Sequence, residues 1–547
     1  MIAYCNYIKY NMVKSYSINY AVLDGGMGEN MKKSCITFIL ALMMLFTLPT
    51  TAYAAKQPVI HIAVNNELVC YPKETQPYID SKKNARIPLF ATSEKLGAFV
   101  EWSKNLDTVI IKHGKDTIKI TLPKSGKDST IKLNNKVIKT SISPILKNKE
   151  IYVSLEFLST FLHCQTSWDN RVHTAFVTLP GFTKKNETLT GNTTTSELLK
   201  IKSFDGYTLT GKLDLPVNAS TVSTLVIFVP GTGPNTYDNH RLVGGKEFNY
   251  YDLFAKELGK RQVGFFRYNT RGVDIGTNPP MYDTIDKKEY VKYTPTNQAQ
   301  DIEAMITELK KNEKLKDAKI VLLGWSEGTI IAPLVAERNK VEVSSLMLAG
   351  YCNEKMQDII EWQLSGASSM IFYCRYFDVN FDGVISKKEF NADPNSLINS
   401  TLGGVTFEQL DMNKDKKLTK IDFAALLVNQ KDNVLTAIEK GDDEWLWNNY
   451  FQITSEWLTD HAKLKANKDT LMKLTIPVNM FHGVYDQNVP LQGVYDIYDA
   501  YQAKSKTNMK AFIFDQNDHD LNYIQYPFYN VIPEGLVRIF DECAKVK

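Results

Sequence analysis

The sequence predicts an α/β protein, with a mostly parallel sheet covered by helices on both faces, preceded by a small β-rich α+β domain. Two patterns carry this prediction. From Leu198 onwards, apolar strand-like runs alternate with helical stretches of ten or more residues, as parallel strands joined by right-handed crossovers require. From residue 55 to 180, short strand patterns with one brief helix occur twice in the same order.

Composition and charge limit the class of protein. At 547 residues the chain is too long for one ordinary core, and a hydrophobic content of 44% suits several folded units. The formal net charge is only +3, so the basic surface expected of a nucleic-acid-binding protein is lacking. We therefore expect a globular protein that binds neither DNA nor RNA.

The region from residue 31 to 54 has the pattern of a secretory signal peptide. Two lysines follow Met31, an apolar stretch runs from residue 36 to 48, and a small-residue cleavage pattern follows. The apolar stretch is shorter than the ~20 residues that span a bilayer. We expect secretion from a bacterial, Gram-positive cell and no membrane attachment after cleavage. Residues 1–30 are interpreted as a mis-assigned upstream extension, because the codons just before Met31 can form a purine-rich ribosome-binding site.

Residues 55–180 contain an internal duplication. A shift of 66 positions aligns Leu89 with Leu155 and Trp102 with Trp168. The stretch resembles the copper amine oxidase-like N-terminal domain of bacterial exported proteins, an accessory module whose name does not imply bound copper. The sequence leaves open whether this domain associates with the cell wall or is only a folded appendage of the chain.

The histidines and cysteines give no sign of a metal site. The four histidines of the N-terminal domain, His61, His113, His163 and His173, are scattered. Five cysteines lie beyond residue 54, which is few and odd in number for a disulfide-stapled secreted fold. Whether Cys70 pairs with Cys164 stays open. The segment 181–197, rich in Thr, Asn and Gly, is predicted to be a flexible linker.

The larger unit, residues 198–547, is predicted element by element. A strand pair surrounds Asp205-Gly206, and the apolar run 223–230 is predicted to be a buried strand that ends in glycine-rich turn residues. The remaining predicted elements are helix 250–261, strand 262–269, helix 297–312, strand 319–325, helix 327–338, strand 343–350 and, after an interruption of about 120 residues, strand 475–486, helix 491–502, strand 509–520 and a last helix from residue 533.

The stretch Gly324-Trp325-Ser326-Glu327-Gly328 stands between a predicted strand and a predicted helix. This is the context of the nucleophile elbow, in which flanking glycines let a strained turn project the serine from the sheet. The helix N-terminus also favours negative charge at the serine oxygen. Ser326 is therefore predicted to be a nucleophile, and the alternative is a serine that only caps the helix.

A serine nucleophile needs a base, and with such an elbow the chain order is serine, acid, histidine. Of the three histidines after Ser326, only His519 lies beyond the expected acid, at the end of the last predicted strand, and we expect it to be the base. His482 is interpreted as a turn residue. Asp486, at the C-terminal end of a predicted strand, is the expected acid. Asp518 is the rival, but adjacent residues seldom direct their side chains at each other.

Two backbone N–H groups should stabilise an oxyanion beside the serine. One is that of Glu327, directly after the nucleophile. The second is expected from Thr232, in the turn after the strand 223–230. Gly231 and Gly233 on either side permit close approach of the backbone.

These residues make about the last 350 positions resemble a bacterial α/β-hydrolase of the esterase type. The motifs stand in order: FDGYTLTGKLDLP, PGTGPNTYDNH, FFRYNTRGVDIGTNP and GWSEGTIIAP. Pro230 and Trp325 stand where histidine is usual. The resemblance implies a secreted serine hydrolase that cleaves small-molecule acyl esters through an acyl-enzyme intermediate. The alternatives are a serine peptidase of the same fold and a calcium-dependent, cell-wall-associated binding protein whose hydrolase domain is incidental.

Within the interruption, residues 378–389 match a complete EF-hand loop. Gly383 allows the sharp bend at position 6, and oxygens at alternate positions suit a hard cation such as Ca²⁺. Ile385 at position 8 is expected to pair with a partner loop. The expected ligands are Asp378, Asn380, Asp382, the Val384 carbonyl and bidentate Glu389, with Ser386 at position 9.

The partner loop is residues 411–422. Lys416 replaces the bend glycine, and the last ligand is one methylene shorter than glutamate, so weaker Ca²⁺ binding is expected there. The whole insertion, residues 352–470, is expected to form a lid over the active site. We hypothesise that calcium orders this lid and shapes the acyl pocket. The ligands expected in the second loop are Asp411, Asn413, Asp415, the Lys417 carbonyl and Asp422.

Overall fold

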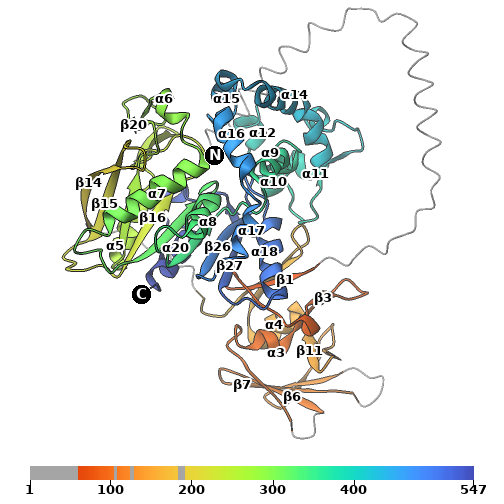
Figure 1. The fold of residues 1–547 in the computed structure, drawn as a ribbon. Helices are drawn as coiled ribbons and strands as arrows, with labels where there is room; N and C mark the ends of the chain where they lie inside the picture. The colour runs from red at the N-terminus through yellow and green to blue at the C-terminus, as the bar shows by residue number, and fades with distance from the viewer. Residues whose placement is uncertain (1–58, 104–106, 124–128, 183–190, 547) are drawn as a thin grey trace, which may run out of the picture. The chain divides into compact units, whose positions relative to one another are not determined.

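The computed structural model describes residues 59–103, 107–123, 129–182 and 191–546 (Figure 1). The predicted upstream extension and signal peptide lie outside these residues, as does part of the predicted linker. The chain divides into two compact units. Residues 60–393 and 407–547 form one of them, whereas residues 394–406, with helix α12 (Leu397–Ser400), belong to the other. Among the described helices, none combines the length and apolar character that crossing a membrane requires.

The C-terminal region is built on one central sheet. In the spatial order given below, the first strand pairs antiparallel with the second, and the second pairs antiparallel with the third. All later neighbours in this region are parallel, so the predicted mostly parallel sheet is confirmed. The spatial order is β14 (Thr194–Lys202), β15 (Thr208–Pro216), β19 (Gly264–Tyr268), β16 (Thr224–Val229), β22 (Lys319–Trp325), β23 (Ser345–Ala349), β26 (Val478–Tyr485) and β27 (Met509–Asp518).

Strand β14 begins inside the segment predicted to be a linker. Residues 194–197 pair with residues 213–216 of β15 across the hairpin. The sequence prediction placed the boundary too late because two threonines and a serine are typical of both linkers and exposed edge strands. Only the pairing with the apolar strand β15 decides between them.

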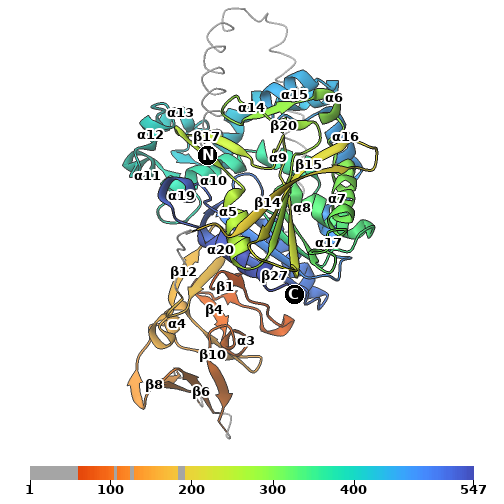
Figure 2. The same ribbon diagram turned by 90° about the vertical axis from the view of Figure 1, so that its left-hand side faces the viewer.

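Helices cover both faces of this sheet (Figures 1 and 2). Strand β16 shows why both faces are buried. Its residues Leu225, Ile227 and Val229 pack into the core on one side, whereas Val226 and Phe228 pack into the core on the other. The first core contains side chains of α7 (Pro295–Leu309), α8 (Gly328–Arg338) and α18 (Gln492–Ala503), and the second contains side chains of α5 (Asp252–Lys260) and α20 (Glu534–Ala544).

The N-terminal domain repeats one order of elements. The series β4, α3, β5, β6 recurs as β11, α4, β12, β13, in agreement with the duplication in the sequence. All five described cysteines are free, so Cys70 and Cys164 do not form a disulfide. The elements are β1 (His61–Val64), β2 (Glu67–Leu68), η1 (Lys73–Thr75), β3 (Tyr78–Ile79), β4 (Ala85–Pro88), α3 (Leu89–Ser93), β5 (Phe99–Trp102), β6 (Thr108–His113), β7 (Asp116–Thr121), β8 (Thr130–Leu133), β9 (Lys136–Ile138), β10 (Ile145–Lys147), β11 (Glu150–Val153), α4 (Leu155–Leu162), β12 (Gln165–Asp169) and β13 (Thr174–Thr178).

This domain shares a sheet with the C-terminal region. Strand β2 pairs with β27 at Glu67 and Phe512, which adds β2, β1, β13 and β12 to the edge of the central sheet. Leu68 and Phe176 of the N-terminal domain belong to the same core as α7 and α18. The N-terminal domain is therefore an integral part of the fold.

The insertion after β23 is mostly helical. Its helices α9 and α16 share a core with Ile330 of α8 and with Val489, which follows β26. Apart from α12, its elements are α9 (Met356–Gln363), α10 (Ala367–Phe377), β24 (Ile385–Ser386), α11 (Lys387–Ala392), α13 (Phe407–Leu410), β25 (Lys417–Leu418), α14 (Lys420–Lys440), α15 (Asp443–Asn449), α16 (Ser455–Lys463) and α17 (Asn467–Leu471). The short elements outside it are β17 (His240–Val243), β18 (Lys246–Asn249), β20 (Val273–Ile275), β21 (Asp283–Ile285), α6 (Lys287–Tyr290) and α19 (Gln525–Tyr529).

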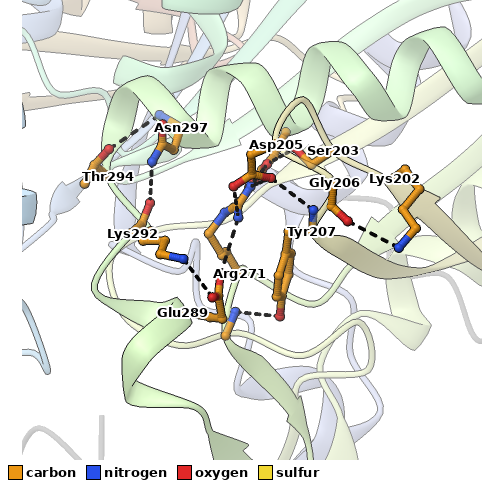
Figure 3. Close-up of polar contacts among 12 residues, drawn as sticks. Lys202, Ser203, Asp205, Gly206, Tyr207, Arg271, Glu289, Lys292, Thr294 and Asn297 are labelled. Carbon is orange, nitrogen blue, oxygen red and sulfur yellow. Dashed lines mark hydrogen bonds and ion pairs between the residues drawn. The ribbon is translucent and has the colours of Figure 1, made fainter.

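A buried ion cluster fixes the loop after β19 (Figure 3). The guanidinium of Arg271 donates to Asp205 in the β14–β15 turn at 2.8 Å and to Asp301 on α7 at 2.6 Å, and it lies 3.8 Å from Glu289 on α6. These partners compensate the charge of a fully buried arginine. The cluster therefore joins the first hairpin, α7 and α6.

Candidate active site

Ser326 lies in a strained turn between β22 and α8. Its φ is 55°, in the left-handed region that non-glycine residues seldom adopt. A Cβ atom at Gly324 would lie 2.3 Å from the Gly328 carbonyl oxygen, and one at Gly328 would lie 2.1 Å from the Val229 carbonyl oxygen. Only glycine fits at either position, which is the physical reason for the Gly-x-Ser-x-Gly pattern here.

His519 and Asp486 are in direct contact. His519 follows β27, and its Nδ1 lies 2.9 and 2.8 Å from the two carboxylate oxygens of Asp486. Asp486 follows β26 and is buried, and its Oδ1 also accepts backbone hydrogen bonds from Asn488 and Val489. His519 and Ser326 line one cavity. Within the described residues, no hydrogen bond joins Ser326 Oγ to His519.

The charged forms of His519 and Asp486 stabilise each other. Burial lowers the pKa of the His519 imidazole, but the charge and hydrogen bond of Asp486 outweigh burial and raise that pKa to about 9. Burial raises the pKa of Asp486, but the positive charge of His519 is among the interactions that hold it below its usual range. An imidazole with this partner is held in one orientation and stabilised when it gains a proton.

Asp518, the rival acid, is held by a different partner. Its Oδ2 accepts a hydrogen bond from Arg375 on α10 at 2.9 Å, and its Oδ1 accepts one from the backbone of Asn522 at 2.8 Å. Arg375 also donates to the Asn522 side chain at 2.7 Å. The carboxylate of Asp518 therefore holds the loop that carries His519 against helix α10.

The interpretation of His482 as a turn residue is wrong. His482 is fully buried inside β26, and its Nε2 lies 3.3 Å from the Val489 carbonyl oxygen and 3.4 Å from Asp486 Oδ2. The glycine that follows it, Gly483, permits close approach of β27, since a Cβ atom there would lie 2.2 Å from the Asn517 carbonyl oxygen. Burial lowers the pKa of His482, so it stays neutral beside the pair.

The predicted oxyanion donors come from two turns, one after β16 and one after β22, which meet beside Ser326. Thr232 lines the cavity with Ser326, and Gly231 lies so close that a Cβ atom there would be 3.0 Å from Ser326 Cβ. In the described part of the chain, the backbone N–H groups of Thr232 and Glu327 donate to no protein acceptor. Both groups are therefore free to bind an oxygen of a substrate.

The side chain of Glu327 forms a buried cluster that sequence reasoning missed. Its Oε1 accepts hydrogen bonds from Gln298 Nε2 at 2.8 Å and Trp457 Nε1 at 2.8 Å, and lies 3.1 Å from His461 Nε2. Trp457 and His461 belong to α16 of the insertion. The residue after the serine therefore anchors the insertion to the elbow. No spacing in the sequence reveals this cluster, because its members come from three separate segments.

The insertion forms part of the wall of the cavity that Ser326 and His519 line. The cavity has a volume of about 240 Å³, which is below the ~300–1,000 Å³ usual for drug-sized ligands. It therefore suits a small substrate. The wall residues from the insertion are Met356, Ile360, Gln363, Tyr450, Phe451, Ile453 and Trp457, and further aromatic wall residues are Phe228, Tyr250, Tyr251 and Trp325.

The first EF-hand loop has the expected backbone. Gly383 has a φ of 80°, as the sharp bend requires, and its N–H donates to Asp378 at 3.0 Å. Glu389 Oε1 is buried without a partner, which leaves this oxygen available to a cation. The predicted pairing of Ile385 is confirmed, since it pairs with Leu418 of the second loop.

The second loop has the same bend without a glycine. Lys416 adopts a φ of 65°, so lysine takes the strained conformation that glycine takes in the first loop. The oxygen ligands of both loops fit Ca²⁺ in type and spacing. In the described residues, no group of three or more His, Cys, Asp or Glu side chains is already drawn together around a metal position. The carboxylates instead accept hydrogen bonds from their own loops, such as Lys416 N–H to Asp411 at 3.0 Å.

Comparisons with known proteins agree with this composite structure. Residues 63–177 match the profile of the copper amine oxidase N-terminal domain, and residues 375–392 match that of the EF hand. The chain combines a copper amine oxidase-type N-terminal domain, an α/β-hydrolase fold and an EF-hand in the insertion. The hydrolase fold rests on the parallel sheet and the elbow between β22 and α8.

Several solved structures are similar at low identity. An esterase of Pyrococcus furiosus is 12% identical, with a TM-score of 0.37 over 66% of this chain and 96% of that chain. An esterase of Exiguobacterium antarcticum is 15% identical, with a TM-score of 0.33 over 63% and 98%. An acylaminoacyl peptidase of Pyrococcus horikoshii is 12% identical, with a TM-score of 0.34 over 81% and 56%. The search of curated proteins gave no match.

Proposed function

We propose that the protein is a secreted serine hydrolase that cleaves carboxylic esters. Ser326 Oγ attacks the acyl carbonyl, while His519 takes the hydroxyl proton and passes it to the leaving alcohol. Asp486 orients the imidazole, and the N–H groups of Thr232 and Glu327 bind the oxyanion. Water then attacks the acyl-enzyme, again with His519 as base, and releases the acid.

One observation carries this proposal. A serine in a strained elbow opens into the same cavity as an imidazole whose far nitrogen contacts a buried carboxylate. A serine that only caps a helix needs neither the strain nor such a histidine. The expected signal peptide supports secretion, although it lies outside the described residues.

We further propose that calcium orders the insertion. Bound Ca²⁺ would neutralise and gather the loop carboxylates, with Asp378 and Glu389 as the first and last ligands of the first loop. Helix α10 leads into this loop and carries Arg375, which binds Asp518 beside His519. Ordering α10 would therefore hold the loop of the catalytic histidine in place.

A panel of chromogenic esters, run on wild type and Ser326→Ala with and without chelator, tests the proposal. We expect ester turnover in wild type and a loss of about 10⁴-fold or more in the variant. Retained turnover in Ser326→Ala would refute the nucleophile. A parallel panel of peptide substrates separates an esterase from a serine peptidase, and wall binding by an inactive variant tests the binding-protein alternative.

A further inference from the structure

Arg241 differs from every other arginine of the chain. The sequence holds nine arginines, all within the described residues. Eight of them lie within 4.0 Å of a carboxylate. In the described structure, Arg241 has no such partner. It is also the one arginine that lines the cavity of Ser326.

The guanidinium of Arg241 is held in position by uncharged groups. Its Nε donates to Asn239 Oδ1 at 2.6 Å, and its carbon lies 4.9 Å from the ring centroid of Tyr250. Asn239 Nδ2 donates in turn to Asn235, whose own amide donates to the Gly233 carbonyl at 3.0 Å in the oxyanion turn. Arg241 is therefore oriented by the same turn that flanks the serine.

This arrangement leaves the terminal nitrogens unused. Within the described residues, Nη1 and Nη2 of Arg241 donate to no protein acceptor. The planar fork of an arginine matches the two oxygens of a carboxylate, and such pairs are strengthened in a partly enclosed, aromatic-lined cavity. The carboxylate that lines the same cavity, Asp520, lies more than 4.0 Å from the guanidinium nitrogens of Arg241, since no ion pair joins them.

We propose that the substrate carries a carboxylate in addition to the ester, and that Arg241 binds this carboxylate. The inference rests on the proposed ester hydrolysis and names its substrate class: small esters with a free carboxylate, such as hemiesters of dicarboxylic acids. Arg241 sets specificity, and the acyl transfer itself is carried out by Ser326 and His519.

Paired esters of similar size, followed by ultraviolet or visible absorbance, test the proposal on the full chain. The pairs are 4-nitrophenyl hemiglutarate against 4-nitrophenyl hexanoate, with the carboxylate on the acyl side, and 4-carboxyphenyl against 4-carbamoylphenyl pentanoate, with the carboxylate on the alcohol side. Wild type should prefer the anionic member of one pair, which tells on which side of the ester Arg241 acts. Arg241→Met should lower that anionic-to-neutral ratio of kcat/KM by about 10- to 100-fold. Arg241→Lys, which keeps the charge but loses the fork, should fall between them.

Lys246→Met is the matched control, because Lys246 lies on the same hairpin but is exposed and outside the cavity. It should keep the wild-type ratio. Wild type that hydrolyses neutral esters without preferring either anionic one would overturn this inference and leave the proposed function intact. An unchanged ratio in Arg241→Met would overturn it too. If no ester is hydrolysed, the proposed function itself fails.

Discussion

Ser326 is held in a left-handed backbone conformation by the two glycines around it. Gly324 and Gly328 let β22, α8 and the end of β16 approach within distances that any side chain would block. In this turn the left-handed φ is that of Ser326 itself, and Ser326 lines the same cavity as His519. The position of Ser326 is therefore set by steric contacts of the backbone, and charge acts only on its partners.

Activity should rise with pH through the pKa of His519. Only the neutral imidazole accepts the serine proton, and Asp486 raises its pKa from 6.5 to about 9. We therefore expect kcat/KM to increase from neutral pH to about pH 9 and to level off above. In Asp486→Asn, only the charges of Asp518 and Asp520 still oppose burial, so the midpoint should fall well below about 9. The plateau should drop by about 10⁴-fold. A pH profile of ester hydrolysis measures both effects, and an unmoved midpoint in Asp486→Asn would contradict the pairing.

Glu327→Gln should destabilise the protein. The change replaces a carboxylate with an amide among the N–H groups of Gln298, Trp457 and His461. Glu327 is only 1% exposed, so water cannot make up for the lost charge. We expect a loss of about 3 kcal/mol in the free energy of unfolding. Glu337→Gln is the control, because Glu337 pairs with Lys465 and Lys473 near the surface. Its cost should be below about 1 kcal/mol. Urea unfolding measures both, and equal losses would show that the buried cluster has no special role.

At the scale of elements, the EF-hand pair and the loop that carries His519 are connected through α10. The end of this helix leads into the first EF-hand loop, and Arg375 within it binds Asp518 and Asn522 around His519. The two loops are joined by the pairing of β24 with β25. The two loops and α10 therefore form one connected unit.

Calcium should stabilise the protein, and the first loop should account for most of the effect. For extracellular affinities of about 10⁻⁴ to 10⁻³ M, about 2 mM Ca²⁺ contributes about 0.6 to 1.8 kcal/mol. Glu389→Gln should remove most of this gain, whereas Asp422→Asn should remove less. Thermal unfolding with and without Ca²⁺ measures it. A melting temperature of wild type that does not respond to Ca²⁺ would contradict the calcium assignment.

The elements were easier to predict than the contacts. Strand 319–325 and the helix after it were found within a residue, because an apolar run and a helical period stand side by side there. His482 was missed because a glycine inside a strand looks like a turn. The cluster of Glu327 and the pair of Arg375 with Asp518 were also missed. Both join residues more than a hundred positions apart, and only the fold brings them together.

At the scale of the whole chain, the N-terminal domain contacts the first EF-hand loop and the strand that leads to Asp486 through Arg171. This arginine donates to the Tyr485 hydroxyl at 3.0 Å, and Tyr485 directly precedes Asp486. Its guanidinium lies over the rings of Tyr485 and Phe381, and its Nε is 4.0 Å from Asp378. The shared sheet and this arginine make the domain a structural partner of the hydrolase.

Arg171→Met should therefore lower the unfolding free energy of the α/β-hydrolase fold as well as that of the N-terminal domain. Loss of charged hydrogen bonds to Asp169 and Tyr485 should cost about 1 to 3 kcal/mol of unfolding free energy. Lys112→Met, which removes an exposed pair with Glu101, should cost below about 1 kcal/mol. Denaturant unfolding followed by tryptophan fluorescence and by loss of ester turnover measures the effect in both parts. Unfolding of the hydrolase unaffected by Arg171→Met would contradict the coupling.

The most direct test of the central claim is covalent labelling of the nucleophile. A fluorophosphonate should add to wild type once per chain, with loss of fluoride, and peptide mass spectrometry should place the adduct on Ser326. Ser326→Ala should take up no label, and His519→Ala should react at least about 10³-fold more slowly. An adduct on another residue, or ester turnover in a chain that the probe does not modify, would contradict the account.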